Sequence, residues 1–301
     1  MAKVRVLCFV TLVVLGGLLI ALLLDREKQT PLHETLAPLL TLLGRPAKSA
    51  DRLLSRVLPL DDLDEQTLGQ ALRARASGSW QRDTRAARYL NALLTTITAG
   101  KQRRFDYEAF VVEGPPNACA LPGGIVLVTR GLLDILSSEA QLASVLGHEV
   151  GHIERGHCFD SARFEMLARK LGPTSLGQIA DFVYAHLAQT SFSKTQESEA
   201  DDYGYEALLA SHYDPAHMSL AFAALLHDEE ERQRGTSRSF DPFRDYIRSH
   251  PPIELRIENF RERAGRWRLQ HPDQPMYVGA RNYREQRARS ESAYEAEWTT
   301  H

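Results

Sequence analysis

Residues 148–157 read HEVGHIERGH, which places three histidines and two glutamates within ten positions. His148 and His152 are four residues apart, a spacing that puts both imidazoles on one face of an α-helix, one turn apart. Glu149 directly follows the first histidine. This H-E-x-x-H arrangement is typical of zinc sites, where the histidines bind the metal and the glutamate takes a proton from a zinc-bound water. The short pattern also arises by chance, so the rest of the chain must support it.

The residues before the motif predict a buried helix that carries it. Ser138 has the position and chemistry of an N-cap, and Gln141, three residues on, can complete a capping box. After this cap, apolar residues recur at helical spacing: Leu142, Val145, Leu146, Val150 and Ile153. The two histidines therefore belong to a helix that packs into a core.

Two stretches upstream of this helix have strand character, FDYEAFVVE at 105–113 and ACALPGGIVLVTRGLL at 118–133. The part at 125–129 is short, β-branched and preceded by Pro-Gly-Gly, which favours a strand. Apolar periodicity predicts further helices near 82–98, 160–171, 175–190, 195–211, 215–233 and 252–264. The predicted fold class is α+β and mainly helical, with a small β-sheet next to the His-Glu helix.

Composition sets broad limits on function. The chain has 301 residues, of which 43% are hydrophobic and 25% charged, as expected for one or two globular domains. Its 36 basic and 39 acidic residues give a net charge of −3, so we predict no nucleic-acid partner. Cys119 and Cys158 show no metal-binding spacing, and whether they pair is left open.

The N-terminus predicts a membrane anchor. VLCFVTLVVLGGLLIALLL, at positions 6–24, runs for 19 residues without a charge, whereas a cleavable signal peptide has an apolar core of only about 7–15 residues. Lys3 and Arg5 precede the run, and the four charges after it cancel, which predicts a cytoplasmic N-terminus. We therefore expect a single-pass inner-membrane protein whose catalytic part lies on the periplasmic side.

Two other locations remain as alternatives. Removal of the run as a signal peptide would leave a secreted or periplasmic protein. The mitochondrial intermembrane space is less favoured, because no Arg- and Ser-rich transit segment precedes the run. The expected organisation is an anchor at 1–25, a proline-punctuated helical connector at 26–80, a catalytic domain at 81–265, and a polar, loosely attached tail at 266–301.

A catalytic zinc site needs three protein ligands and an open position for water. His157 follows His152 by five residues, whereas the extended form of the motif requires six with an intervening glycine. We therefore interpret His157 as a residue at the end of the helix. The remaining candidates lie downstream in TQESEADDYG at 195–204.

Within that stretch Glu197 and Asp201 are four residues apart and share a helix face, while Glu199 points to nearly the opposite side. One of the two glutamates can therefore be a ligand, but not both. Glu197 is preferred because Asp201 would stand beside it to orient a ligand imidazole or handle a proton. Ala200 would let this helix approach the first closely. The alternative is a solvated acidic helix face.

Four segments, in order, resemble the M48 family of zinc metallopeptidases. They are NACALPGGIVLVTRGLL at 117–133, LGHEVGHIERGH at 146–157, ESEAD at 197–201 and SHPPIELRI at 249–257. Together they cover about 80–265 and select Glu197 over Glu199 as the E-x-x-A-D glutamate. Cys119 departs from the family by replacing the usual aromatic residue. Because only one span is predicted, the chain is more similar to the single-domain bacterial periplasmic and mitochondrial intermembrane-space members than to the multi-span members.

The resemblance implies a zincin-like metallopeptidase domain with one Zn²⁺ per chain. The metal would be held by His148, His152 and Glu197, with Asp201 beside them. Glu149 would act as general base on the zinc-bound water. The resemblance thus assigns the H-E-x-x-H motif a catalytic role.

The late motif adds His250 and Arg256, which the resemblance implies stabilise the oxyanion of the tetrahedral intermediate. His250 can instead occupy the open zinc position and hold the enzyme latent. An extended polypeptide substrate is expected to add to 125–129 as an edge strand. The predicted function is a membrane-anchored zinc endopeptidase acting on misfolded or damaged envelope proteins. The alternative is a catalytically silent module that binds unfolded polypeptide or membrane-protein partners.

Overall fold

The computed structural model describes residues 61–75, 80–82, 84–160, 162–163, 166, 175–187, 192–234, 250 and 253–299. The chain divides into two compact units, Met1–Pro59 and Leu60–His301, and every described residue belongs to the second. The predicted membrane anchor therefore lies outside the described residues. Among the described helices, none combines the length and the apolar character needed to cross a membrane.

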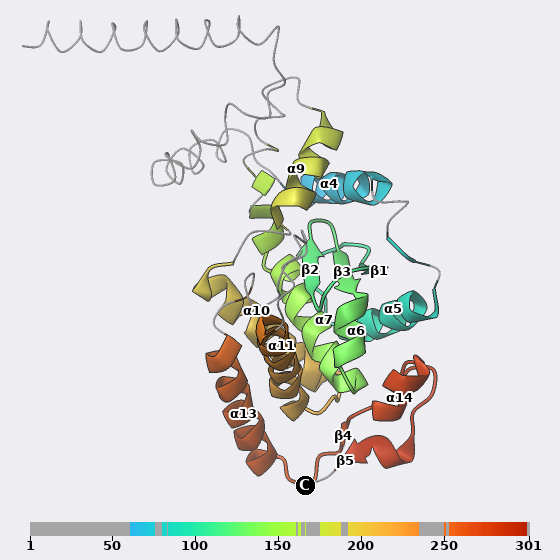
Figure 1. Ribbon diagram of the computed structural model, residues 1–301, viewed down its shortest axis with the longest axis vertical. Helices are drawn as coiled ribbons and strands as arrows, with labels where there is room; N and C mark the ends of the chain where they lie inside the picture. Colours follow the sequence, from blue (N-terminus) through green and yellow to red (C-terminus); the bar gives the residue numbers. More distant parts are fainter. Residues whose placement is uncertain are drawn as a thin grey trace, which may run out of the picture. The chain divides into compact units, whose positions relative to one another are not determined.

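The second unit is mainly helical and contains a small β-sheet, as predicted (Figure 1). In chain order its elements are α4 (Asp62–Arg75), α5 (Arg85–Ile97), β1 (Glu108–Val112), β2 (Ala118–Leu121), β3 (Ile125–Thr129), α6 (Arg130–Ile135), α7 (Glu139–Glu154), α9 (Leu176–Leu187), α10 (Lys194–Ala210), α11 (Ala216–Arg234), α13 (Ile253–Gln270), β4 (Met276–Tyr277), α14 (Ala280–Glu285) and β5 (Trp298–Thr299). The helix predicted at 160–171 lies largely outside the described residues.

The three-stranded sheet has the order β1-β3-β2. Strand β3 is parallel to β1 and antiparallel to β2, and all five of its residues are buried. The prediction that 125–129 is an edge strand is therefore wrong, because β3 has a hydrogen-bonded neighbour on both sides. A continuous apolar run such as IVLVT is typical of a strand buried on both faces. Within the described residues, β2 forms a ladder on one side only.

Helix α7 passes through the core, with α5 on one side and α10 and α11 on the other (Figure 1). Every residue from Glu139 to Ile153 is buried. Ser138 caps the helix, accepting a hydrogen bond from the Gln141 amide at 3.2 Å. The Gln141 side chain accepts from the Ser137 amide at 2.7 Å rather than from Ser138. The predicted cap at Ser138 is confirmed. The second bond of the capping box is donated by the Ser137 amide in place of the Ser138 amide.

Small residues bring α7 and α10 into backbone contact. A Cβ added to Gly147 would lie 3.2 Å from the Gly204 Cα, and one added to Gly151 would lie 2.8 Å from the Ala200 carbonyl oxygen. Side chains larger than these would separate the two helices. The close approach expected at Ala200 is confirmed, and it places the side chains of α10 against the histidines of α7.

The sequence predicts that the catalytic domain begins at residue 81, but the folded unit begins earlier. Helix α4, assigned to the connector, buries Leu68 and Leu72 completely or nearly so. Its Gly69 faces Gly123 in the turn between β2 and β3, where an added Cβ would come within 2.9 Å of the glycine Cα. The last part of the predicted connector therefore belongs to the folded unit.

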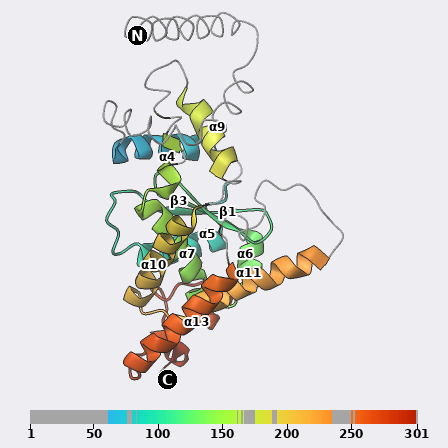
Figure 2. The same ribbon diagram turned by 90° about the vertical axis from the view of Figure 1, so that its left-hand side faces the viewer.

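The prediction of a loosely attached tail at 266–301 is also wrong. Helix α13 continues to Gln270 beside α11, as Figures 1 and 2 both show, and β4, α14 and β5 follow it. Tyr277 and Asn282 are fully buried. The carbonyls of Val278 and Gly279 accept hydrogen bonds from the first amides of α7, at 3.0 and 3.1 Å. The polar composition of the segment concealed that a few of its residues are buried anchors.

Candidate metal centre

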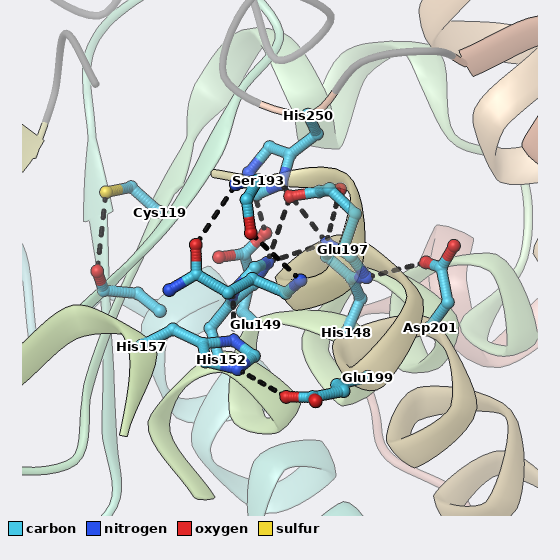
Figure 3. Close-up of polar contacts among 12 residues, drawn as sticks. Cys119, His148, Glu149, His152, His157, Ser193, Glu197, Glu199, Asp201 and His250 are labelled. Carbon is cyan, nitrogen blue, oxygen red and sulfur yellow. Dashed lines mark hydrogen bonds and ion pairs between the residues drawn. The ribbon is translucent and has the colours of Figure 1, made fainter. Parts of the chain in front are cut away.

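Four side chains converge in the interior of the unit (Figure 3). His148 and His152 come from α7, Glu197 comes from α10, and His250 lies just before α13. All four are buried, and one donor atom from each lies within 4.8 Å of the others. His148 Nε2 is 3.1 Å from His152 Nε2 and 3.2 Å from His250 Nδ1, and the latter atom is 2.9 Å from Glu197 Oε1.

The charge states of these groups suit a divalent metal. Burial lowers the pKa of His152 to about 3 and that of His148 well below its usual value, so both imidazoles are neutral at pH 7. Burial by itself would raise the pKa of Glu197, but the imidazoles of His250, His152 and His148 outweigh it and lower that pKa. Two neutral imidazoles and one carboxylate form a donor set that zinc favours.

Glu149 lies beside this cluster on α7 and is fully buried. Its Oε1 atom is 3.6 Å from His250 Nε2. Neither carboxylate oxygen forms a hydrogen bond of ordinary geometry with the described residues. Burial raises the pKa of Glu149 to about 7, and a general base works best when its pKa lies near the working pH. The group can therefore both accept and release a proton at neutral pH.

The Nδ1 atom of His148 contacts the buried ion pair formed by Asp201 and Arg256. Asp201 Oδ1 is 2.9 Å from His148 Nδ1. The Arg256 guanidinium donates through Nε and Nη2 to the two oxygens of Asp201, at 2.9 and 2.6 Å. The same side chain donates to the His250 carbonyl at 3.1 Å and lies 3.0 Å from Glu197 Oε2. Arg256 therefore connects α13 to α10 and to the segment that carries His250.

His152 is held by a different set of groups. Its Nδ1 lies 3.0 Å from His157 Nδ1, and His157 Nε2 lies 3.0 Å from Glu199 Oε2 (Figure 3). Phe192 stacks on the imidazole with ring centroids 3.8 Å apart. His157 does follow the end of α7, and it is not among the converging donors. Its contact with His152 was missed.

A local signal for that contact exists in the sequence. Gly156 has a φ of +76°, in the left-handed region, where glycine is favoured. This turn after α7 returns the chain so that His157 faces the helix it has just left. Nothing in the sequence marks Phe192. Separately, Cys119 and Cys158 are both free thiols.

Comparison with known proteins places this geometry in a family. Residues 81–264 match peptidase family M48. The chain is 29% identical over 161 residues to the metalloprotease LoiP of Escherichia coli, covering 49% of this chain and 58% of that protein.

Two further relatives match over a smaller share of their own length. Identity to the mitochondrial metalloendopeptidase OMA1 of Arabidopsis thaliana is 31% over 150 residues, which is 48% of this chain and 29% of the relative. Identity to the beta-barrel assembly-enhancing protease of E. coli is 27% over 214 residues, or 64% and 42% respectively. In each case the match takes in less than two thirds of the relative's length. Because the family match extends over more than half of this chain and contains the buried donor cluster, the chain belongs to peptidase family M48.

Proposed function

We propose that this chain is a zinc-dependent endopeptidase. The observation that carries the proposal is the buried arrangement of two neutral imidazoles and one ionised carboxylate, with the high-pKa Glu149 carboxyl beside them. His148, His152 and Glu197 would hold the metal. When bound there, zinc would lower the pKa of a water molecule to about 7 and polarise the scissile carbonyl.

The residues around the cluster have separate proposed roles in the reaction. Glu149 takes a proton from the attacking water and delivers it to the leaving amine. His250 Nε2 lies on the Glu149 side of the cluster and can donate to the oxyanion. Arg256 and Asp201 are already committed to each other and to His148. We therefore assign these two a positioning role, in place of the direct role that the family resemblance suggested for Arg256.

The substrate is proposed to bind as an added strand along β2. Strand β2 packs against α7, the helix that carries Glu149, and among the described residues it pairs only with β3. The free side of an edge strand offers backbone donors and acceptors to an extended chain. Backbone pairing tolerates many sequences, which suits misfolded or damaged polypeptides as the substrate class.

His250 supports a second reading of the same site. His250 is one of the four converging residues, and its Nδ1 lies 3.2 Å from His148 Nε2 and 2.9 Å from Glu197 Oε1, so the imidazole can fill the position that a catalytic water needs. In that state the enzyme is latent, and a substrate or partner must move His250 to open it. Replacing His250 with alanine distinguishes the two readings, because it raises the rate of a latent enzyme and lowers that of an active one.

The location proposed for the catalytic unit is the periplasmic side of the inner membrane. The uncharged run at 6–24 and the basic residues before it support this location. A phosphatase reporter fused after residue 30 is expected to be active outside the cytoplasm. Mass spectrometry that finds a mature N-terminus near residue 25 would instead indicate a secreted enzyme.

The decisive experiment for the activity compares the full chain with Glu149→Gln. This change keeps the shape of the side chain and removes the proton acceptor, so zinc content should stay near one per chain. Loss of a general base reduces the rate by about 10²–10⁴-fold. We expect the wild type to cleave denatured casein and the variant to bind it with little cleavage.

Two outcomes would contradict the assignment. Equal cleavage by wild type and Glu149→Gln would exclude Glu149 as the base. If zinc-loaded wild type and His250→Ala both bind denatured casein without cutting it, the chain is a polypeptide-binding module and the peptidase proposal is wrong.

A further inference from the structure

The second histidine of the H-E-x-x-H motif contacts groups on both sides of its ring. His152 Nε2 faces the donor cluster, 3.1 Å from His148 Nε2 and 3.4 Å from Glu197 Oε1. The opposite nitrogen, Nδ1, faces away from the cluster and lies 3.0 Å from His157 Nδ1. His157 Nε2 in turn lies 3.0 Å from Glu199 Oε2 (Figure 3). The three side chains form a line from the metal centre to the surface.

The chemistry of the groups allows one arrangement of protons when both rings are neutral. An ionised carboxylate can only accept hydrogen bonds, so His157 Nε2 must donate to Glu199. A neutral imidazole carries one N–H, so His157 Nδ1 is then an acceptor. His152 Nδ1 must therefore donate to it. That leaves a bare lone pair on His152 Nε2, which is the atom that faces the cluster.

The surroundings hold this line in place. His157 is buried, with 3% of its surface exposed, and Phe192 stacks on the face of the His152 ring. The Glu199 side chain is half exposed, so water keeps its carboxylate solvated. A half-turn of the His152 ring about its Cβ–Cγ bond would break the bond to His157.

We propose that His157 and Glu199 form a positioning pair that fixes the tautomer and ring orientation of the metal ligand His152. Neither residue belongs to the four converging donors. A ligand histidine usually donates its second N–H to a carboxylate, carbonyl or water, and loss of that partner typically weakens metal binding by about 10–100-fold. In this chain an imidazole stands between the ligand and the carboxylate. This inference rests on the proposed zinc site.

The test measures zinc affinity of the full chain by competition with a chelator. His157→Leu removes both nitrogens and should weaken zinc binding by about 10–100-fold. His157→Asn keeps an acceptor oxygen at the position of Nδ1 and should restore most of that loss. Glu199→Gln should weaken binding less than His157→Leu, because an amide oxygen can still accept from His157. At saturating zinc all three should still bind one ion per chain.

A spectroscopic readout separates positioning from general stability. In the cobalt-substituted protein, the visible absorption bands of the metal should shift in His157→Leu and stay near the wild-type position in His157→Asn. The matched control is the exposed pair His227 and Glu231 on α11, whose Nε2 and Oε1 atoms are 3.4 Å apart. His227→Leu and Glu231→Gln should change neither affinity nor spectrum.

The outcomes distinguish this inference from the proposed function. If the wild-type chain binds no zinc, the proposed zinc site and the positioning pair are both overturned. Wild-type affinity and cobalt spectrum in both His157→Leu and Glu199→Gln would overturn the pair alone. If His157→Leu does not fold, Glu199→Ala decides, because it removes the acceptor altogether and, at a half-exposed side chain, should not affect folding. Equal losses in His157→Asn and His157→Leu would also overturn the proposed acceptor role.

Discussion

The two ligand histidines of α7 are held in physically different ways. Behind His148 lie Asp201 and Arg256, which are 8% and 5% exposed. Behind His152 lie His157, which is buried, and Glu199, whose side chain is half exposed. Ionic groups that lose their partners in a desolvated interior cost far more than groups that water can reach. Changes behind His148 should therefore affect the stability of the whole unit, and changes behind His152 should affect mainly the metal.

The largest effect is expected from the two glutamates of α10. Glu197→Ala removes a proposed metal ligand from inside the cluster and should lose most of the zinc. Glu199→Ala removes a group from the outer end of the His152 line, so it should still reach one zinc per chain at saturation. Metal analysis of the two variants after dialysis checks both expectations. Loss of zinc in Glu199→Ala with retention in Glu197→Ala would reverse the ligand assignment.

The next effect tests whether the buried ion pair controls folding stability. Arg256→Gln leaves Asp201 and Glu197 buried without their guanidinium, a change that should cost about 3–5 kcal/mol of unfolding free energy. Arg263 is the matched control on the same helix, since it pairs with Asp202 at 2.6 Å on the surface. Arg263→Gln should cost about 0–1 kcal/mol.

Denaturant unfolding of both metal-free proteins measures the difference. Equal losses for the two arginine variants would show that burial does not distinguish the ion pairs. The contrast between the two sides of the site would then have no energetic basis.

A smaller effect is expected where α7 and α10 touch. Gly204→Ala would place a Cβ 2.8 Å from the His148 backbone nitrogen, and overpacking of this kind typically costs about 1–3 kcal/mol. A Cβ on Gly265 of α13 meets no atom within 4 Å. Gly265→Ala should therefore stabilise the protein by up to about 1 kcal/mol, because alanine favours the helix.

Thermal unfolding and zinc affinity together check this prediction. Gly204→Ala should lower both, because the altered contact separates the helices that carry Glu197 and His148. A variant that loses stability but keeps full zinc affinity would show that the site tolerates a wider helix spacing.

Several features of the site could be predicted because they depend on short-range geometry. A spacing of four residues puts side chains on one helix face in any context, which paired His148 with His152 and Glu197 with Asp201. The cap at Ser138 and the close approach at Ala200 also follow from residue types near the helix itself. Glu199 was correctly placed on the other side of α10, where it lies away from the four donors.

The errors have one physical origin. An apolar run such as 125–129 shows that a strand is buried, but only its neighbours decide whether it is central or at an edge, and β3 has two. The segment after Gln270 has a polar composition, yet Tyr277 and Asn282 are fully buried. Burial of a few anchors depends on the surface that receives them, which the segment's own composition does not reveal.

The sequence by itself determined which side chains share a helix face, and therefore predicted the zinc motif and the preferred third ligand, with the adjacent Glu149 as the proposed base. Only the tertiary structure decided how separate elements meet. It brought His250, from the segment before α13, and Arg256, from α13, to the cluster where the family resemblance alone had suggested them, and it placed His157 against His152. Local spacing follows from the geometry of one helix, whereas contacts between elements depend on side-chain packing throughout the core.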